Sequence, residues 1–117
     1  MSAKISETYV PDAGDIIFLD FDPKKGHEQA GERPAIVLSV RDLNRAYGVL
    51  LCCPMTTKLR GTPNEVPIAS DKPSVAVATH AQTIDFVARN VRFLRKSTRD
   101  ELIAVRKLVK SIVGPTQ

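Results

Sequence analysis

Three ionisable side chains stand close together in one polar stretch of the sequence. His27, Glu28 and Arg33 all lie between Gly26 and Pro34. An imidazole and a carboxylate can exchange protons with a substrate, and a guanidinium can hold a phosphate through two parallel hydrogen bonds. A base, an acid and a fixed cation are what phosphodiester cleavage by a neighbouring 2′-hydroxyl requires in the absence of a metal. DNA lacks that hydroxyl, so this chemistry would be confined to RNA.

A second polar stretch adds hydroxyl groups and cations directly after an apolar run. Its candidate residues are Thr56, Thr57, Lys58 and Arg60. If the two stretches flank neighbouring strands, one groove would hold an imidazole, a carboxylate, a guanidinium and hydroxyls. The sequence therefore predicts a phosphate-binding groove built by two loops.

Each of these side chains also has a purely structural interpretation. His27 could be a solvated loop histidine, Glu28 could pair with a lysine, and Arg33 could cap a strand end. A threonine such as Thr56 often satisfies backbone groups in a turn. The two histidines and the scattered acids show no metal-ligand spacing, and we expect no metal or cofactor.

The apolar runs predict strands over residues 15–21, 35–40 and 48–55, with the second beginning after Pro34. Shorter strands are expected over 65–69 and 74–79, and a less regular extended piece over 82–94. Pro67 predicts that the 65–69 strand lies at an edge or bulge. Residues 41–47 suit one helical turn. Cys52 and Cys53 are adjacent, so on a strand they point to opposite faces and do not form a disulfide.

The C-terminal segment has the pattern of an amphipathic helix over about 98–113. Ser97 or Thr98 can cap it, with an acid three residues further on. Apolar residues recur at helical spacing, and cations occupy the opposite face. The apolar positions are Leu102, Val105, Leu108 or Val109, and Ile112, and the cations are Arg106, Lys107 and Lys110. We therefore expect a mainly β fold, a strongly bent sheet or partly open barrel, with one C-terminal helix packed on it.

Length and composition predict one small globular domain. The chain has 117 residues, 43% hydrophobic and 26% charged, with a net charge of +4 that favours polyanionic partners. We expect residues 1–8 to be a flexible segment and residues 9–117 to form the domain. No apolar run approaches the roughly 20 residues needed to span a bilayer, and the N-terminus lacks a secretory signal. Two reduced thiols suit the cytoplasm.

The order of these motifs resembles the MazF/PemK/Kid family of bacterial toxin endoribonucleases. The resemblance is carried by four stretches and a later glycine, which are Tyr9-Val10-Pro11-Asp12-Ala13-Gly14-Asp15, Asp20-Phe21-Asp22-Pro23, Gly26-His27-Glu28-Gln29-Ala30-Gly31-Glu32-Arg33-Pro34-Ala35, Pro54-Met55-Thr56-Thr57 and Gly61. It extends from about Tyr9 to the C-terminal helix.

The resemblance implies an SH3-like barrel and a homodimer that inhibits translation and growth. It implies metal-independent cleavage of single-stranded RNA at short motifs, leaving a 2′,3′-cyclic phosphate and a 5′-hydroxyl. A cognate antitoxin would occupy the RNA groove with a flexible acidic tail, and the complex of the two would bind operator DNA. Arg33 matches the family's catalytic arginine and Thr56 its catalytic-loop threonine, while Glu28 and His27 match residues implicated in some members.

One position departs from the family pattern. Members often carry an Asp-Gln or Asn-Gln pair on a late strand, and the aspartate is a base in one branch. Thr79-His80 stands there in this chain, and a threonine is no general base near neutral pH. His80 could take part in proton transfer, or it could only line the groove. Residues expected to contact RNA are Thr57, Lys58, Arg60, His80 and Gln82.

Two other functions are compatible with part of this pattern. Gyrase poisons of the CcdB type share the barrel but grip a protein target with a tryptophan near the C-terminus. This sequence contains no tryptophan and ends Val113-Gly114-Pro115-Thr116-Gln117, which counts against that function. The two basic loops alone would also suit an RNA-binding module without turnover.

Overall fold

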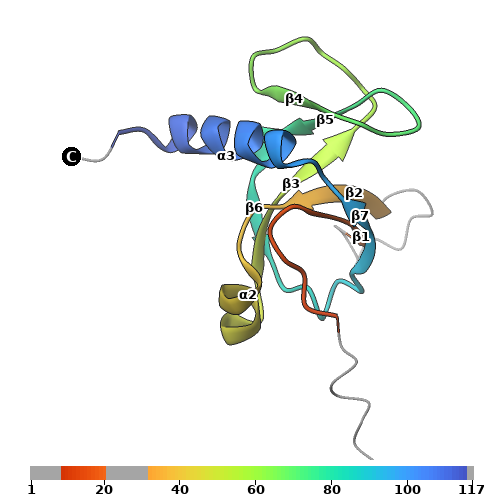
Figure 1. The fold of residues 1–117 in the computed structure, drawn as a ribbon, viewed down its shortest axis with the longest axis vertical. Coiled ribbons are helices and arrows are strands. Elements are labelled where there is room, and N and C mark those ends of the chain that lie inside the picture. Colours follow the sequence, from red (N-terminus) through yellow and green to blue (C-terminus); the bar gives the residue numbers. More distant parts are fainter. Residues whose placement is uncertain (1–8, 21–31, 116–117) are drawn as a thin grey trace, which may run out of the picture.

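A computed structural model describes residues 9–20 and 32–115 (Figure 1). In chain order the elements are β1 (Asp15–Asp20), β2 (Glu32–Val37), α2 (Arg41–Tyr47), β3 (Leu50–Thr56), β4 (Glu65–Ile68), β5 (Ser74–Val77), the 3-10 helix η1 (Ala78–His80), β6 (Gln82–Ile84), β7 (Arg92–Lys96) and α3 (Arg99–Val113). The strands form one antiparallel sheet in the order β4-β5-β3-β2-β1-β7, and β6 pairs with β3. In the described part of the chain β4 and β7 end this path unpaired with each other, so the barrel is open.

The three central strands are covered on both faces. Ile16, Ile36 and Cys53 point into one buried cluster, which α3 closes with Val105. The intervening residues, such as Ile17 and Cys52, point into a second cluster that β6 and Phe86 complete. Figure 1 shows α3 lying across one side of the bent sheet while β1, β2 and β7 curl away on the other. Burial on both faces explains why these strands are continuous apolar runs in the sequence.

The two cysteines lie in different clusters, as their alternation on a strand predicts. Cys52 and Cys53 are free thiols and fully buried. Burial raises the pKa of the Cys52 thiol to about 12, with a smaller contribution from Cys53, and that of the Cys53 thiol to about 11. Both therefore stay protonated near neutral pH and behave as small apolar side chains.

Several strand boundaries differ from the sequence prediction. The second strand begins at Glu32 rather than after Pro34, and it ends at Val37. At Pro34, β2 pairs with β1 only, because its pairing with β3 starts at Ala35. A proline is tolerated there because the strand has a neighbour on one side only. The predicted strand over 74–79 ends at Val77 and turns into η1, and the 82–94 piece divides into β6 and β7. The edge position predicted from Pro67 is confirmed, since β4 is the outermost strand.

The C-terminal helix is confirmed as α3. The structure decides between its two candidate caps, and it corrects the predicted surroundings of Arg106 and Ile112. Thr98 rather than Ser97 is the cap, and it forms a reciprocal capping box with Glu101. The Arg106 guanidinium is not confined to the open face, because it donates to the Leu38 carbonyl over 3.1 and 2.7 Å. Ile112 belongs to the predicted apolar face but is 46% exposed. The last turn of α3 therefore extends beyond the hydrophobic core.

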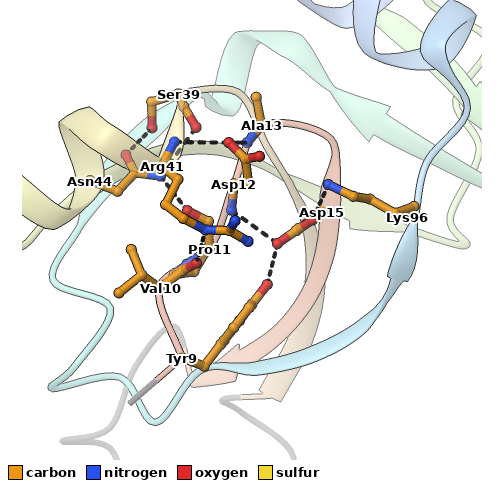
Figure 2. Close-up of polar contacts among 10 residues, drawn as sticks. All are labelled: Tyr9, Val10, Pro11, Asp12, Ala13, Asp15, Ser39, Arg41, Asn44 and Lys96. Carbon is orange, nitrogen blue, oxygen red and sulfur yellow. Dashed lines mark hydrogen bonds and ion pairs between the residues drawn. The ribbon is translucent and has the colours of Figure 1, made fainter. Parts of the chain in front are cut away.

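A polar network fixes the segment that precedes β1 (Figure 2). The buried Asp15 carboxylate accepts from the Tyr9 hydroxyl at 2.5 Å and from the Asp12 amide at 2.9 Å. Its other oxygen pairs with the Lys96 ammonium of β7 at 2.6 Å. Burial, followed by the hydrogen bond to Asp15, raises the pKa of Tyr9 far above its usual value, so the hydroxyl stays a donor. The network ties the N-terminal segment to the two strands β1 and β7.

The same network continues to α2. The Asp12 carboxylate accepts from the Ala13 and Arg41 amides at 2.9 and 2.8 Å. Partial burial opposes ionisation of Asp12, but these two hydrogen bonds, together with the charges of Arg41 and Lys96, lower its pKa. The side-chain amide of the buried Asn44 donates to the Pro11 and Ser39 carbonyls. These bonds hold α2 against the N-terminal segment, on the side of the sheet seen at the bottom of Figure 1.

Candidate active site

Strand pairing brings the described end of the first predicted polar segment to the second. In the antiparallel pair of β2 and β3, Ala35 lies opposite Pro54. The residues before Ala35 therefore approach those after Pro54, which brings Arg33 toward Thr56. The condition for a shared groove, that the two stretches flank neighbouring strands, is therefore met at Arg33 and Thr56.

A pocket of about 380 Å³ opens beside this pair of residues. It is lined by Arg33, Pro54, Met55, Thr56, Lys58, Arg60, Thr62, Asn64, Glu65, Val77, Thr79 and His80. A second hollow of about 230 Å³ shares Arg33, Met55 and Thr56 with it and adds Pro34, Thr57 and Ser74. Arg33 and Thr56 thus border both hollows, and we call the two together the groove.

The Thr56 hydroxyl is oriented by its own loop. Its oxygen accepts from the Lys58 backbone amide at 3.0 Å. An oxygen that accepts in this way keeps its hydrogen to donate in another direction. Thr56 is half-buried, so the hydroxyl can donate to a ligand oxygen in the groove.

Three cations of the groove form no ion pair with any described residue. Within residues 9–20 and 32–115, the three ion pairs join Arg45 to Asp42, Arg92 to Glu32 and Lys96 to Asp15. None of them involves Arg33, Lys58 or Arg60, and all three of these side chains are exposed. Their charge is therefore available to a polyanion such as RNA.

The Thr79-His80 pair enters the groove from η1 rather than from a strand. The chain leaves β5 at Val77, and the Ala78 amide bonds to the Asn64 carbonyl at 2.9 Å. This turn presents Thr79 and His80 at the pocket wall, with His80 exposed. His80 therefore shares one pocket with Arg33 and Thr56.

The other predicted residues are distributed unevenly. Thr57 lines only the smaller hollow, and Gln82 lines neither. The side-chain amide of Gln82 donates to the His80 carbonyl at 3.4 Å. His27 and Glu28 lie outside the described residues. Glu65 was not predicted, although it lines the pocket; its signal in the sequence is an acid at the start of a strand, just after the turn Gly61-Thr62-Pro63-Asn64.

The described part of the chain has dispersed potential metal ligands and only short helices. No three His, Cys, Asp or Glu side chains there gather as they would around a metal ion. No helix there is both long and apolar enough to cross a bilayer.

A family model matches residues 12–113, which is most of the chain. That family is described as the PemK-like, MazF-like toxin of type II toxin–antitoxin systems. The chain belongs to this toxin family. The resemblance of its motifs to the family is therefore confirmed.

Individual relatives support the assignment of this toxin. The endoribonuclease toxin MazF of Escherichia coli strain K12 is 40% identical over 107 residues, covering 91% of this chain and 96% of the relative. A crystal structure of MazF from Deinococcus radiodurans is 37% identical with a TM-score of 0.82, over 92% of this chain and all of that one. A MazE–MazF structure from the same organism is 32% identical with a TM-score of 0.81, covering 93% and 100%. The predicted architecture, mainly β with a C-terminal helix, is confirmed.

Proposed function

We propose that the groove beside Arg33 and Thr56 is the active site at which this toxin cleaves single-stranded RNA without a metal. As a family member with a 40% identical endoribonuclease relative, the chain is an RNA-cleaving toxin of a toxin–antitoxin system. The observation that carries the site assignment is the meeting of a guanidinium and an oriented hydroxyl in a groove whose cations form no ion pair within the described residues.

The reaction would proceed by internal attack. The ribose 2′-oxygen forms a bond to phosphorus while the bond to the 5′-oxygen breaks, leaving a 2′,3′-cyclic phosphate and a 5′-hydroxyl. A base takes the proton from the 2′-hydroxyl, and an acid returns one to the departing oxygen. The Arg33 guanidinium matches the non-bridging phosphoryl oxygens and stabilises their growing charge, and the Thr56 hydroxyl donates to the same oxygens.

Proton transfer is assigned to an imidazole and a carboxylate that are close to Arg33 in the sequence. Glu28 and His27 lie a few residues before Arg33 in the chain and are the proposed pair. His80 is the alternative partner, because it lines the same pocket as Arg33. The RNA contacts would come from Lys58 and Arg60 beside it, with Thr57, His80 and Gln82 further along.

The same cations suit a protein inhibitor. We propose that a cognate antitoxin places a flexible acidic tail in the groove, where its carboxylates would replace RNA phosphates at Arg33, Lys58 and Arg60. The solved complex of a related MazF with MazE supports such a partner. We propose that the toxin acts in the cytoplasm. The toxin–antitoxin complex would also bind operator DNA.

The test is incubation of the pure protein with a long single-stranded RNA in excess EDTA. We expect defined fragments with 2′,3′-cyclic phosphate and 5′-hydroxyl ends, because the groove uses side chains in place of a metal. Intact RNA with a measurable binding constant would favour an RNA-binding module without turnover. Intact RNA without binding would favour a protein target such as gyrase.

We also propose that the toxin is a homodimer. Large apolar side chains remain exposed on β7 and along α3, namely Phe93, Leu94, Ile103, Ile112 and Val113. A two-fold pairing would cover such surfaces, and it is the commonest arrangement of small oligomers. Light scattering should give about twice the chain mass of 12.8 kDa. A species of only one chain mass at micromolar concentration would contradict the dimer.

A further inference from the structure

Glu65 places a negative charge in a groove otherwise suited to phosphates. It is the first residue of β4, and it lines the same pocket as Lys58 and Arg60. A carboxylate at this position repels RNA phosphates unless nearby donors bind it and offset its charge. In the structure, donors of the neighbouring loop bind the Glu65 carboxylate.

The Glu65 carboxylate binds backbone amides of the loop that precedes it. The Arg60 amide donates to both carboxylate oxygens at 3.2 Å, and the Gly61 amide donates to one of them at 3.0 Å. Two successive amides turned toward one anion form a concave anion-binding arrangement. Hydrogen bonds to a charged acceptor are about twice as strong as those between neutral groups.

The conformation of the loop depends on this arrangement. Gly61 has φ +71°, in the left-handed region that side chains disfavour. On the β3 side the loop is fixed by the Thr56–Lys58 bond, and on the β4 side the Glu65 amide donates to the Thr62 carbonyl at 3.3 Å. The carboxylate of Glu65 is thus the contact that joins the middle of loop 57–64 to the sheet.

We propose that Glu65 is a positioning residue that holds loop 57–64 so that Lys58 and Arg60 meet the RNA in a fixed place. Through them it sets the affinity for RNA and the choice of cleavage sites, and it exchanges no proton with the substrate. This inference rests on the proposed cleavage of RNA in the groove.

The test compares E65A and E65Q with the unchanged toxin on one RNA that contains a preferred cleavage site and several poorer ones. E65A should raise KM by about tenfold, the effect of losing one charged hydrogen-bonding group, and change kcat by less than about threefold. It should also cut the poorer sites relatively more often. E65Q keeps one amide-accepting oxygen, so its KM and site preference should lie between those of E65A and the unchanged toxin.

Two further variants make the test specific. G61A keeps the carboxylate but strains the loop, and a Cβ there would contact nothing within 4 Å, so it should reproduce the KM rise of E65A. If E65A does not fold, G61A and E65Q carry the comparison. D42N removes one exposed charge on α2 and should leave both constants and the site preference unchanged.

Two results would overturn the inference. If E65A and E65Q both lowered kcat about a hundredfold or more and removed a limb of its pH profile while KM stayed unchanged, Glu65 would be a proton-transfer residue. If KM and site preference stayed unchanged in E65A and G61A, the loop would need no anchor. If the unchanged toxin cut no RNA, the proposed function would be rejected instead. The role of the loop in RNA affinity would then be tested by binding, and it would be rejected if E65A and G61A bound RNA as tightly as the unchanged toxin.

Discussion

Replacing Arg33 with alanine is expected to reduce RNA cleavage by about 10³-fold in kcat, the scale seen when a transition-state donor or cation is removed. Arg33 borders both hollows of the groove and has no ion-pair partner in the described part of the chain, so its charge is free for a phosphate. The loss should appear mainly in kcat, because charge builds on the phosphoryl oxygens in the transition state. Single-turnover rates on a short RNA with one cleavage site would measure it.

The controls for this prediction separate charge from geometry. R33K keeps the charge but loses the planar fork, so we expect a rate between those of R33A and the unchanged toxin. R45A removes an exposed arginine of α2 outside the groove and should cut at the normal rate. Arg33 is exposed, so R33A should unfold at the normal temperature. A folded R33A that cleaves RNA at the unchanged rate would refute the assigned role.

The Asp15→Ala substitution is expected to lower the free energy of unfolding by about 3 kcal/mol, since it removes several contacts of a buried charged group. Asp15 is 1% exposed and joins Tyr9, the Asp12 amide and Lys96 through its two oxygens. Without the carboxylate, the Tyr9 hydroxyl and the Asp12 amide lose their acceptor, and the N-terminal segment is released from β1. For a chain of this size the melting temperature should fall by about 10 °C.

Urea unfolding of matched variants would check the origin of this loss. The Lys96 side chain is 57% exposed, but its partner oxygen on Asp15 is buried and has no hydrogen bond, so K96M should cost about 1–2 kcal/mol, less than D15A. D15N keeps the shape and one acceptor oxygen and should fall between D15A and the unchanged toxin. Equal urea midpoints for D15A and the unchanged toxin would show that the Asp15 contacts drawn in Figure 2 add nothing to stability.

Local features of the fold could be predicted from the sequence. The α3 helix was recognisable because Thr98 and Glu101 stand at capping-box spacing and the apolar residues repeat at helical intervals. The central strands were recognisable as apolar runs separated by polar loops. The edge position of β4 followed from Pro67, because a proline lacks the amide that an inner strand must donate. Each of these depends on the chemistry of residues that are neighbours in the chain.

The sequence by itself also determined the family of this toxin and its first candidate residues. The spacing of Arg33 and Thr56 within recognisable motifs was enough to name both. It did not predict that Pro34 lies within β2, because the single-sided pairing that permits it depends on where β3 starts. Nor did it predict the contact from Arg106 to Leu38, which joins residues far apart in the chain.

The composition of the groove was decided by tertiary structure. Pairing of β2 with β3 brings Arg33 to Thr56, and the end of β5 directs His80 to the same pocket. Glu65 gains its role only because loop 57–64 turns its amides back onto the carboxylate. Residue types and local spacing therefore identified the chemical groups. Their meeting in one groove depends on strand register and loop closure, which are set by contacts between distant parts of the chain.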